Sequence, residues 1–364
     1  MPFRADPRRS RRASWRGTLA AAALALTAPA ALAQAQPAGA LQGKRVLITP
    51  YWLDNFNTAN TSWIARLLKP MGVETDVINP NAQSSKQLNT IETAISSQNY
   101  DEIVWAPVDA TTAGTTIRKI QQARIPQLLN VSGAKPGMDG LQFAAISVDW
   151  TTVYVPAGED AARYVKAHPN LGPARIAWVG DLPASQVCRE RFSGLEKGVK
   201  TVIPDAEVVF NEGASSQEQA RSKMTDFITR DIPFNIFAGC GGTVSLGGIA
   251  AINAAGLGGA VNKAPEHVYM MSLDGSPPEL DLLWKGNVAL MRAGLFGPKR
   301  AAQVAVKTIA DQLTGKLPYD KASDASVDLI WLTPDCDKER PVAVEQFEGV
   351  QGFKVPECSF KYSE

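Results

Sequence analysis

Four charged or reactive side chains stand at consecutive positions after a predicted strand that ends at Val179. These are Cys188, Arg189, Glu190 and Arg191, in the segment "GDLPASQVCRERFSG", and they begin a predicted helix. A neighbouring cation lowers the pKa of a thiol, so Cys188 beside Arg189 could act as a nucleophile. An arginine fork could instead donate two parallel hydrogen bonds to vicinal hydroxyls or to a carboxylate. In a third interpretation, these side chains form a solvated helix face and have no functional role.

The composition argues against several kinds of chemistry. The chain has only two histidines, His168 and His267, which leaves Cys188 without an evident base and makes a histidine-rich metal site or triad hard to build. The glycine-rich stretch "GCGGTVSLGG" departs from the dinucleotide spacing GxGxxG. A net charge of +1 indicates neither nucleic acid nor an anionic membrane as a partner. We therefore expect no enzyme, no metal and no cofactor.

The first 33 residues have the pattern of an export signal. A basic segment with many arginines precedes the apolar run "TLAAAALALTAPAALA", which ends in the small residues of a cleavage site. We predict a signal peptide over 1–33 and a soluble, periplasmic product. The pair Arg11-Arg12 leaves twin-arginine export open beside a plain secretory signal.

Export also bears on the four cysteines. They form an even set in an oxidising compartment, which favours disulfides. Cys336 and Cys358 lie in an irregular C-terminal segment that a bridge would staple. Cys188 and Cys240 could form the second bridge or could be two buried free thiols.

The rest of the chain alternates predicted strands and helices. From Lys44 onward, four strand–helix units follow one another in about 100 residues, and the pattern restarts near 143–150. This order predicts an α/β fold of two doubly wound parallel-sheet lobes. Ligands of such sheets bind beyond the carboxyl ends of the strands. Those segments are 51–57, 79–83, 107–110 and 130–132 in the first lobe, and 180–191, 211–213, 239–243 and 274–276 in the second.

Several of these segments resemble one family. The stretches "TPYWLDNFNTANTSW", "RIPQLLNVSGA", "RERFSGLEKGV" and "MMSLDGSPPELDLLWKG" are similar, in this order, to motifs of the type I periplasmic sugar-binding proteins of ABC importers, the ribose- and galactose-binding group. The resemblance covers about 44–332. It implies two lobes joined by a hinge at which the chain crosses three times. The N-terminal lobe would comprise 44–148 plus 296–324, and the C-terminal lobe 149–295 plus 325–345. A tail over 346–364 would follow.

The resemblance also implies which residues bind the ligand. Arg189 corresponds to the sugar-binding arginine of the family, and Asp274 to its strand-end aspartate, although an aspartate there could also cap the next helix. Arg191 would point away from Arg189 and serve the scaffold. The predicted ligand-binding set is Asp54, Phe56, Asn57, Asn130, Trp150, Arg189 and Asp274. For Trp150, packing at the hinge is an equal alternative to ligand binding.

Some positions depart from the pattern of the family. Asn130 and Ser132 replace a charged pair, the glycine-rich stretch lacks an expected amide, and Gly294 stands where the family has a glutamine. These changes suit a ligand that is bulkier or less hydroxylated than ribose. We expect a monomeric receptor that captures a small polar ligand, a sugar or polyol, and delivers it to an ABC permease. The alternatives are an exported enzyme using Cys188, or a ligand receptor for a chemoreceptor or sensor kinase.

Overall fold

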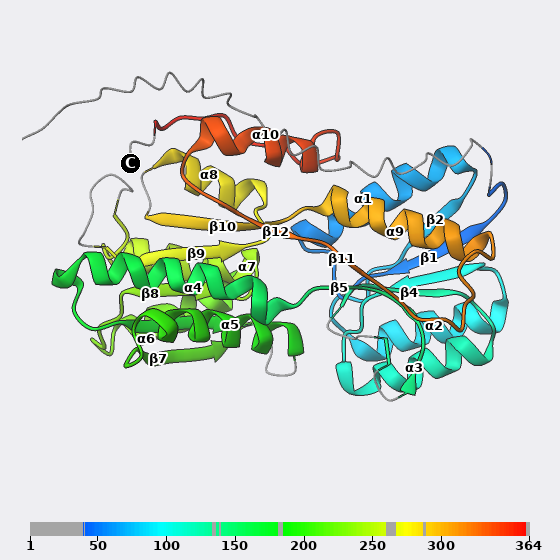
Figure 1. Ribbon diagram of the computed structural model, residues 1–364, viewed down its shortest axis with the longest axis horizontal. Coiled ribbons are helices and arrows are strands. Elements are labelled where there is room, and N and C mark those ends of the chain that lie inside the picture. Colours follow the sequence, from blue (N-terminus) through cyan, green and yellow to red (C-terminus); the bar gives the residue numbers. More distant parts are fainter. Residues whose placement is uncertain are drawn as a thin grey trace, which may run out of the picture. The chain divides into compact units, whose positions relative to one another are not determined.

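The computed structural model describes residue 39 and the ranges 41–132, 136–137, 140–180, 185–259, 267–286 and 289–361. The predicted signal peptide lies outside the described residues. Two separate six-stranded sheets, each flanked by helices, make up the described part (Figure 1). This confirms the predicted α/β fold class.

The first sheet has the strand order β11-β5-β4-β3-β1-β2, and all its pairings are parallel. Its strands are β1 (Arg45–Thr49), β2 (Glu74–Val77), β3 (Glu102–Trp105), β4 (Gln127–Ser132), β5 (Ala144–Ser147) and β11 (Ser323–Ser326). The helices of this part are α1 (Asn55–Leu68), η1 (Lys69–Met71), α2 (Ser84–Ser97), α3 (Ala110–Gln122) and α9 (Pro298–Leu313). The central strands are buried, as their apolar sequences predict.

The second sheet has the order β12-β10-β9-β8-β6-β7, and only the edge pair β10–β12 is antiparallel. Its strands are β6 (Arg175–Gly180), β7 (Glu207–Gly213), β8 (Ile236–Gly239), β9 (Tyr269–Leu273), β10 (Leu290–Phe296) and β12 (Leu329–Leu332). The helices here are α4 (Trp150–Ala167), η3 (Pro169–Leu171), α5 (Gln186–Val202), α6 (Gln217–Ile228), α7 (Gly242–Ala254) and α8 (Pro277–Lys285).

The chain passes between the two sheets three times. It leaves the first sheet after β5 and enters α4, returns after β10 into α9, and crosses again between β11 and β12. Each sheet therefore contains strands that are distant in the sequence. The last crossing lies between Ser326 and Leu329.

Close packing of α4 on α5 fixes the rotation of α5 about its own axis. A Cβ at Gly194 would collide with the backbone of Thr151, and one at Gly198 would collide with the backbone of Val155. Glycine at these positions lets the two backbones approach directly. The face of α5 that carries the glycines, together with the apolar Leu195 and Val199, is therefore held inward.

The C-terminal segment joins elements of both lobes. Helix α10 (Cys336–Phe347) packs beside α9, and the indole Nε1 of Trp63 donates to the carbonyl oxygen of Gln346 at 2.8 Å. Further along, the hydroxyl of Ser359 donates to the carbonyl oxygen of Trp284 at the end of α8, at 3.2 Å. The predicted Cys336–Cys358 disulfide is confirmed, with Cα atoms 5.6 Å apart.

This disulfide should contribute to stability through chain entropy. The bridge spans 22 residues of sequence, so its loss in the variant Cys336→Ser/Cys358→Ser should lower the free energy of unfolding by about 3 kcal/mol. Urea denaturation followed by circular dichroism measures the change. An unchanged midpoint and slope would show that the native contacts alone hold the C-terminal segment.

Candidate functional site

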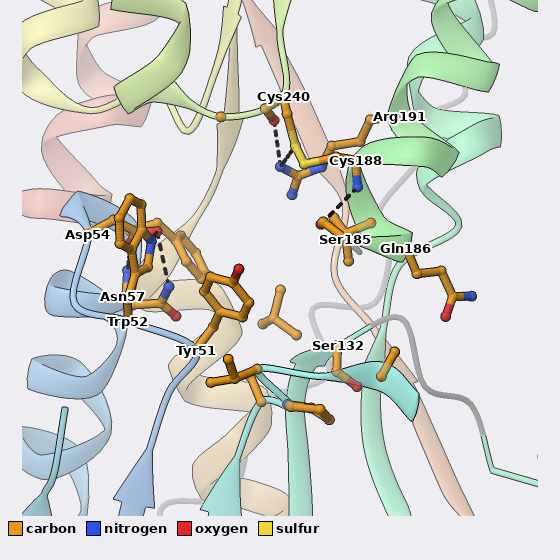
Figure 2. A pocket seen from close by; sticks show the side chains of 18 of the residues that line it. Tyr51, Trp52, Asp54, Asn57, Ser132, Ser185, Gln186, Cys188, Arg191 and Cys240 are labelled. Atoms are coloured by element: carbon orange, nitrogen blue, oxygen red, sulfur yellow. Dashed lines mark hydrogen bonds between the residues drawn. A yellow bond between two sulfur atoms is a disulfide. The ribbon is translucent and has the colours of Figure 1, made fainter. Parts of the chain in front are cut away.

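A cavity of about 180 Å³ is formed by strand-end segments of both sheets (Figure 2). It is lined by Tyr51, Trp52, Asp54, Phe56, Asn57, Ala106, Pro107, Val108, Ala110, Ala113, Val131, Ser132, Ser185, Gln186, Val187, Cys188, Arg191, Cys240, Gly241, Thr243, Val244 and Asp274. These residues lie at or after the carboxyl ends of β1, β3 and β4 in one sheet and of β6, β8 and β9 in the other. This is where parallel sheets place their ligands. Of the described residues, none from 79–83 or 211–213 lines the cavity.

Three aromatic side chains of the β1–α1 segment form part of the lining. The rings of Tyr51 and Trp52 meet edge to face, with centroids 6.4 Å apart. Phe56 is buried against Phe296, with centroids 5.2 Å apart. Figure 2 shows Tyr51, Trp52 and Asp54 across the pocket from Arg191 and Cys188. Aromatic faces of this kind offer apolar contact to the C–H groups of a ligand.

Asp54 organises the start of α1. Its carboxylate accepts from the backbone N–H of Asn57 at 2.7 Å, which makes it the N-cap of the helix. It also accepts from the side-chain amide of Asn57 at 3.2 Å and from the indole Nε1 of Trp52 at 2.6 Å. Burial raises the pKa of Asp54, and these hydrogen bonds and Arg191 counteract part of that rise. Asp54 therefore orients Trp52 and Asn57 while it faces the cavity.

Arg191 is the arginine that lines the cavity. Its Nη1 donates to the carbonyl oxygen of Cys240 at 2.6 Å, and its guanidinium lies over the ring of Trp150, 3.7 Å from the centroid. Trp150 is fully buried and also packs on Phe296. It lies outside the lining, where it supports Arg191 from behind.

The structure places Arg189 on the exposed side of α5, away from the cavity. Successive residues of a helix are about 100° apart, so two positions separate Arg189 from Arg191 by roughly 200°. Arg191 precedes the buried Leu195 by four residues and therefore shares its face. Arg189, the arginine that the family resemblance favours for ligand binding, therefore lies outside the cavity lining, and Arg191, the expected scaffold residue, lies in it.

Asp274 extends from the end of β9 into the cavity, as the strand-end rule predicts. Its φ of 103° is a conformation that non-glycine residues rarely adopt, and such strain concentrates at functional sites. Its carboxylate accepts from the backbone N–H of Gly242 at 2.8 Å. Burial, and then the charge of Asp54, raises the pKa of Asp274 to about 7, while Arg191 acts in the opposite direction.

The cap of the next helix is a different residue. Ser276 is the N-cap of α8 and forms a capping box with Glu279, whose carboxylate accepts from the backbone N–H of Ser276 at 2.8 Å. Burial and the nearby charge of Asp274 raise the pKa of Glu279 to about 8. Asp274 is thus free of the capping role that was its alternative.

Asn130 lies outside the cavity lining. It is buried, and its side-chain amide donates to Oδ1 of Asn60 at 2.7 Å. Ser132, two residues further along β4, does line the cavity. A regular strand would direct both side chains to the same face. Val131 breaks that alternation, because its φ is 52° and the pairing of β4 with β5 shifts there.

Cys188 and Cys240 form a disulfide with each other, so they are not the two buried free thiols that were the alternative. Their Cα atoms are 5.3 Å apart, and both residues line the cavity. All four cysteines of the chain are described, and no free cysteine occurs among them. Cys188 is therefore a half-cystine here, without the thiol that a nucleophile requires.

Several lining residues were not singled out from the sequence. Tyr51, Gln186 and Thr243 each lie within a strand-end segment, so their location was predictable although their role was not. For Arg191, the sequence contains a pattern that indicates an inward-facing side chain. The apolar Leu195 and Val199 define the inner face of the helix, and stepping back four residues from Leu195 gives Arg191.

Two further features bear on the type of protein. Across the described ranges, no helix is both long and apolar enough to cross a membrane. Within the same residues, no group of three or more histidine, cysteine or acidic side chains is arranged to hold a metal ion.

Comparison with known sequences gives one family and one curated relative. A family model for the periplasmic binding protein domain matches residues 46–317. The ABC transporter periplasmic-binding protein YphF of Escherichia coli K12 is 27% identical over 187 residues. That match covers 50% of this chain and 56% of the relative, so the chain spans little more than half of the relative's length.

Solved structures of ABC transporter solute-binding proteins share the fold. One from Bacillus halodurans C-125 with bound myo-inositol has a TM-score of 0.69 at 18% identity and covers 83% of this chain and 98% of its own. One from Actinobacillus succinogenes 130z with bound D-allose has a TM-score of 0.68 at 19% identity, covering 81% and 99%. The arabinose-binding component from Shewanella sp. ANA-3 has a TM-score of 0.70 at 16% identity, covering 86% and 100%.

The raised pKa of Asp274 predicts a pH-dependent cost to stability. A carboxyl whose pKa is higher in the folded protein than in the unfolded chain binds its proton more tightly when folded. The free energy of unfolding therefore falls as pH rises from near 4 through about 7. Asp274→Asn removes this loss, so its melting temperature relative to wild type should be higher at pH 8 than at pH 5, by about 2 °C or more.

Differential scanning fluorimetry at the two pH values measures this change. The exposed Asp205→Asn is the matched control for removal of one carboxylate far from the cavity. If the melting temperature of Asp274→Asn differs from that of wild type by the same amount at both pH values, the raised pKa of Asp274 is contradicted.

Proposed function

Because this chain belongs to the periplasmic binding protein family, we propose that it captures a small polar ligand, a sugar or a polyol, between its two lobes and delivers it to an ABC importer. In this proposal the protein acts in the periplasm as a monomeric receptor and not as an enzyme. The enzyme alternative required a free thiol at Cys188, which the disulfide occupies.

The observation that carries the proposal is the mixture of side chains in the cavity. One lobe contributes aromatic rings with Asp54, and the other contributes Arg191 and Asp274. Carboxylates accept hydrogen bonds from hydroxyls, a guanidinium donates to them, and rings cover the apolar face of a sugar. A ligand between these groups contacts both lobes, so closure over it is favoured.

The size of the cavity supports a ligand of monosaccharide size. Its volume of about 180 Å³ lies below the range of roughly 300–1,000 Å³ typical of pockets for drug-sized molecules. Two solved structures of the same fold hold myo-inositol and D-allose. Both are compact, polyhydroxylated molecules.

A thermal-shift screen tests the ligand class. The protein is heated with single sugars and polyols, including myo-inositol, D-allose and L-arabinose, and separately with nucleosides and small aromatic acids. A ligand present at one hundred times its Kd stabilises the folded state by about 2.7 kcal/mol, which raises the melting temperature. A screen in which only charged or aromatic compounds raise the melting temperature would contradict the sugar or polyol class.

The two arginines of α5 provide a matched pair for testing the site. Arg191→Ala should weaken binding of the screened ligand at least about tenfold, the effect of losing roughly 1.4 kcal/mol. Arg189→Ala should leave the affinity unchanged, because that side chain is exposed and lies outside the cavity lining. Isothermal titration calorimetry measures both. Equal losses, or a loss in Arg189→Ala alone, would show that the ligand binds elsewhere on α5.

A further inference from the structure

A single short loop holds both charged cavity residues of the second lobe. The loop runs from Cys240, directly after β8, to Gly242, the first residue of α7. The carbonyl oxygen of Cys240 accepts from Arg191 at 2.6 Å, and the backbone N–H of Gly242 donates to Asp274 at 2.8 Å. Movement of this loop would therefore displace the hydrogen-bond partners of both Arg191 and Asp274.

The loop has few side chains of its own to hold it in place. Gly241 is the N-cap of α7 and contributes no side-chain hydrogen bond to the helix. Contacts from neighbouring elements restrain the loop instead. The backbone N–H of Cys240 donates to the carbonyl oxygen of Val179 at 2.9 Å, and Gly242 packs so closely that a Cβ there would collide with Glu279.

The Cys188–Cys240 disulfide adds the covalent restraint on the loop. Cys188 lies in the first turn of α5, three residues before Arg191 and on the same face of the helix. The bond ties the loop to the helix that carries Arg191 (Figure 2). Helix, loop and guanidinium form a closed ring of contacts: Cys188 to Cys240 through sulfur, and Cys240 to Arg191 through the carbonyl oxygen.

We propose that the Cys188–Cys240 disulfide is a positioning element for Arg191 and Asp274, and that ligand affinity depends on the redox state of this bond. The effect on affinity rests on the proposed function of the cavity, whereas the effect on side-chain position does not. A dithiol reductant such as dithiothreitol transfers two electrons and two protons to the bridge, leaving two cysteine thiols, and becomes a cyclic disulfide itself. Reduction would free the glycine-rich loop and loosen both charged side chains.

The chain contains its own control. The Cys336–Cys358 disulfide lies in the C-terminal segment, and neither of its cysteines lines the cavity. Removing either bridge releases a constraint on the unfolded chain and should lower the melting temperature. Only removal of Cys188–Cys240 should change the site.

The test compares Cys188→Ser/Cys240→Ser with Cys336→Ser/Cys358→Ser by isothermal titration calorimetry, using the sugar or polyol found in the thermal-shift screen. We expect about tenfold weaker binding in the first variant, as befits a lost positioning contact, and affinity within about twofold of wild type in the second. Wild-type affinity in Cys188→Ser/Cys240→Ser, even with a lower melting temperature, would overturn the proposal and leave the bridge a purely stabilising role.

A measurement without ligand separates this inference from the proposed function. In arginine-labelled protein, the Nε–H resonance of Arg191 should be shifted by the ring of Trp150 beneath it, and Arg191→Lys assigns it. The shift should collapse in Cys188→Ser/Cys240→Ser and persist in Cys336→Ser/Cys358→Ser. If the shift collapses in Cys188→Ser/Cys240→Ser but no sugar or polyol in the screen binds, the positioning role is supported and the sugar or polyol class is contradicted. A retained shift would overturn the positioning role.

The wild-type protein provides a further measurement in case the serine variant fails to fold. Peptide mapping by mass spectrometry measures the reduced fraction of each disulfide at equilibrium in buffers of defined ratio of reduced to oxidised dithiothreitol. By reciprocal linkage, saturating ligand should raise the ratio needed to reduce half of Cys188–Cys240 by about tenfold and leave that for Cys336–Cys358 unchanged. An equal ratio for Cys188–Cys240 with and without a ligand that binds would overturn the proposal.

Discussion

Two half-buried carboxylates from different lobes share the field of one guanidinium, and the cavity is organised around them. Asp54 belongs to the first lobe, whereas Asp274 and Arg191 belong to the second. Burial raises the pKa of both carboxyls, the charge of Asp54 raises that of Asp274 further, and Arg191 offsets part of the rise in each. The interaction couples the lobes electrostatically. In the proposed function, a ligand that donates hydroxyls to these carboxylates relieves the same cost, which would link binding to closure.

The position of Arg191 depends on several layers of structure. Direct backbone packing of α4 on α5 at Gly194 and Gly198 sets the rotation of the helix. Trp150, at the start of α4, supports the guanidinium from behind, and Cys240 holds it through a carbonyl oxygen. The disulfide ties that carbonyl to the same helix. A cavity-facing side chain held from three sides has little conformational freedom left to lose, which in the proposed function favours affinity.

The strand-end rule located nearly the whole cavity from the sequence, because the ends of parallel strands meet along one edge of a sheet. It could not choose among side chains within a segment. The resemblance to sugar-binding proteins favoured Arg189, but the structure places Arg191 in the cavity, since the phase of α5 follows its buried face. Asn130 and Ser132 show the same limit. Their shared face in a regular strand is lost at Val131, where the backbone adopts a positive φ.

The sequence by itself determined the alternation of strands and helices, the segments that meet at the strand ends and the set of cysteines available for pairing. These properties depend on local hydrophobic periodicity and chain order, which a sequence states directly. Tertiary structure alone decided that Cys188 pairs with Cys240, that Arg191 faces inward and that Asn130 bonds to Asn60. Each of these depends on contacts between segments far apart in the chain, where helix packing and a strand irregularity fix orientations that local periodicity leaves open.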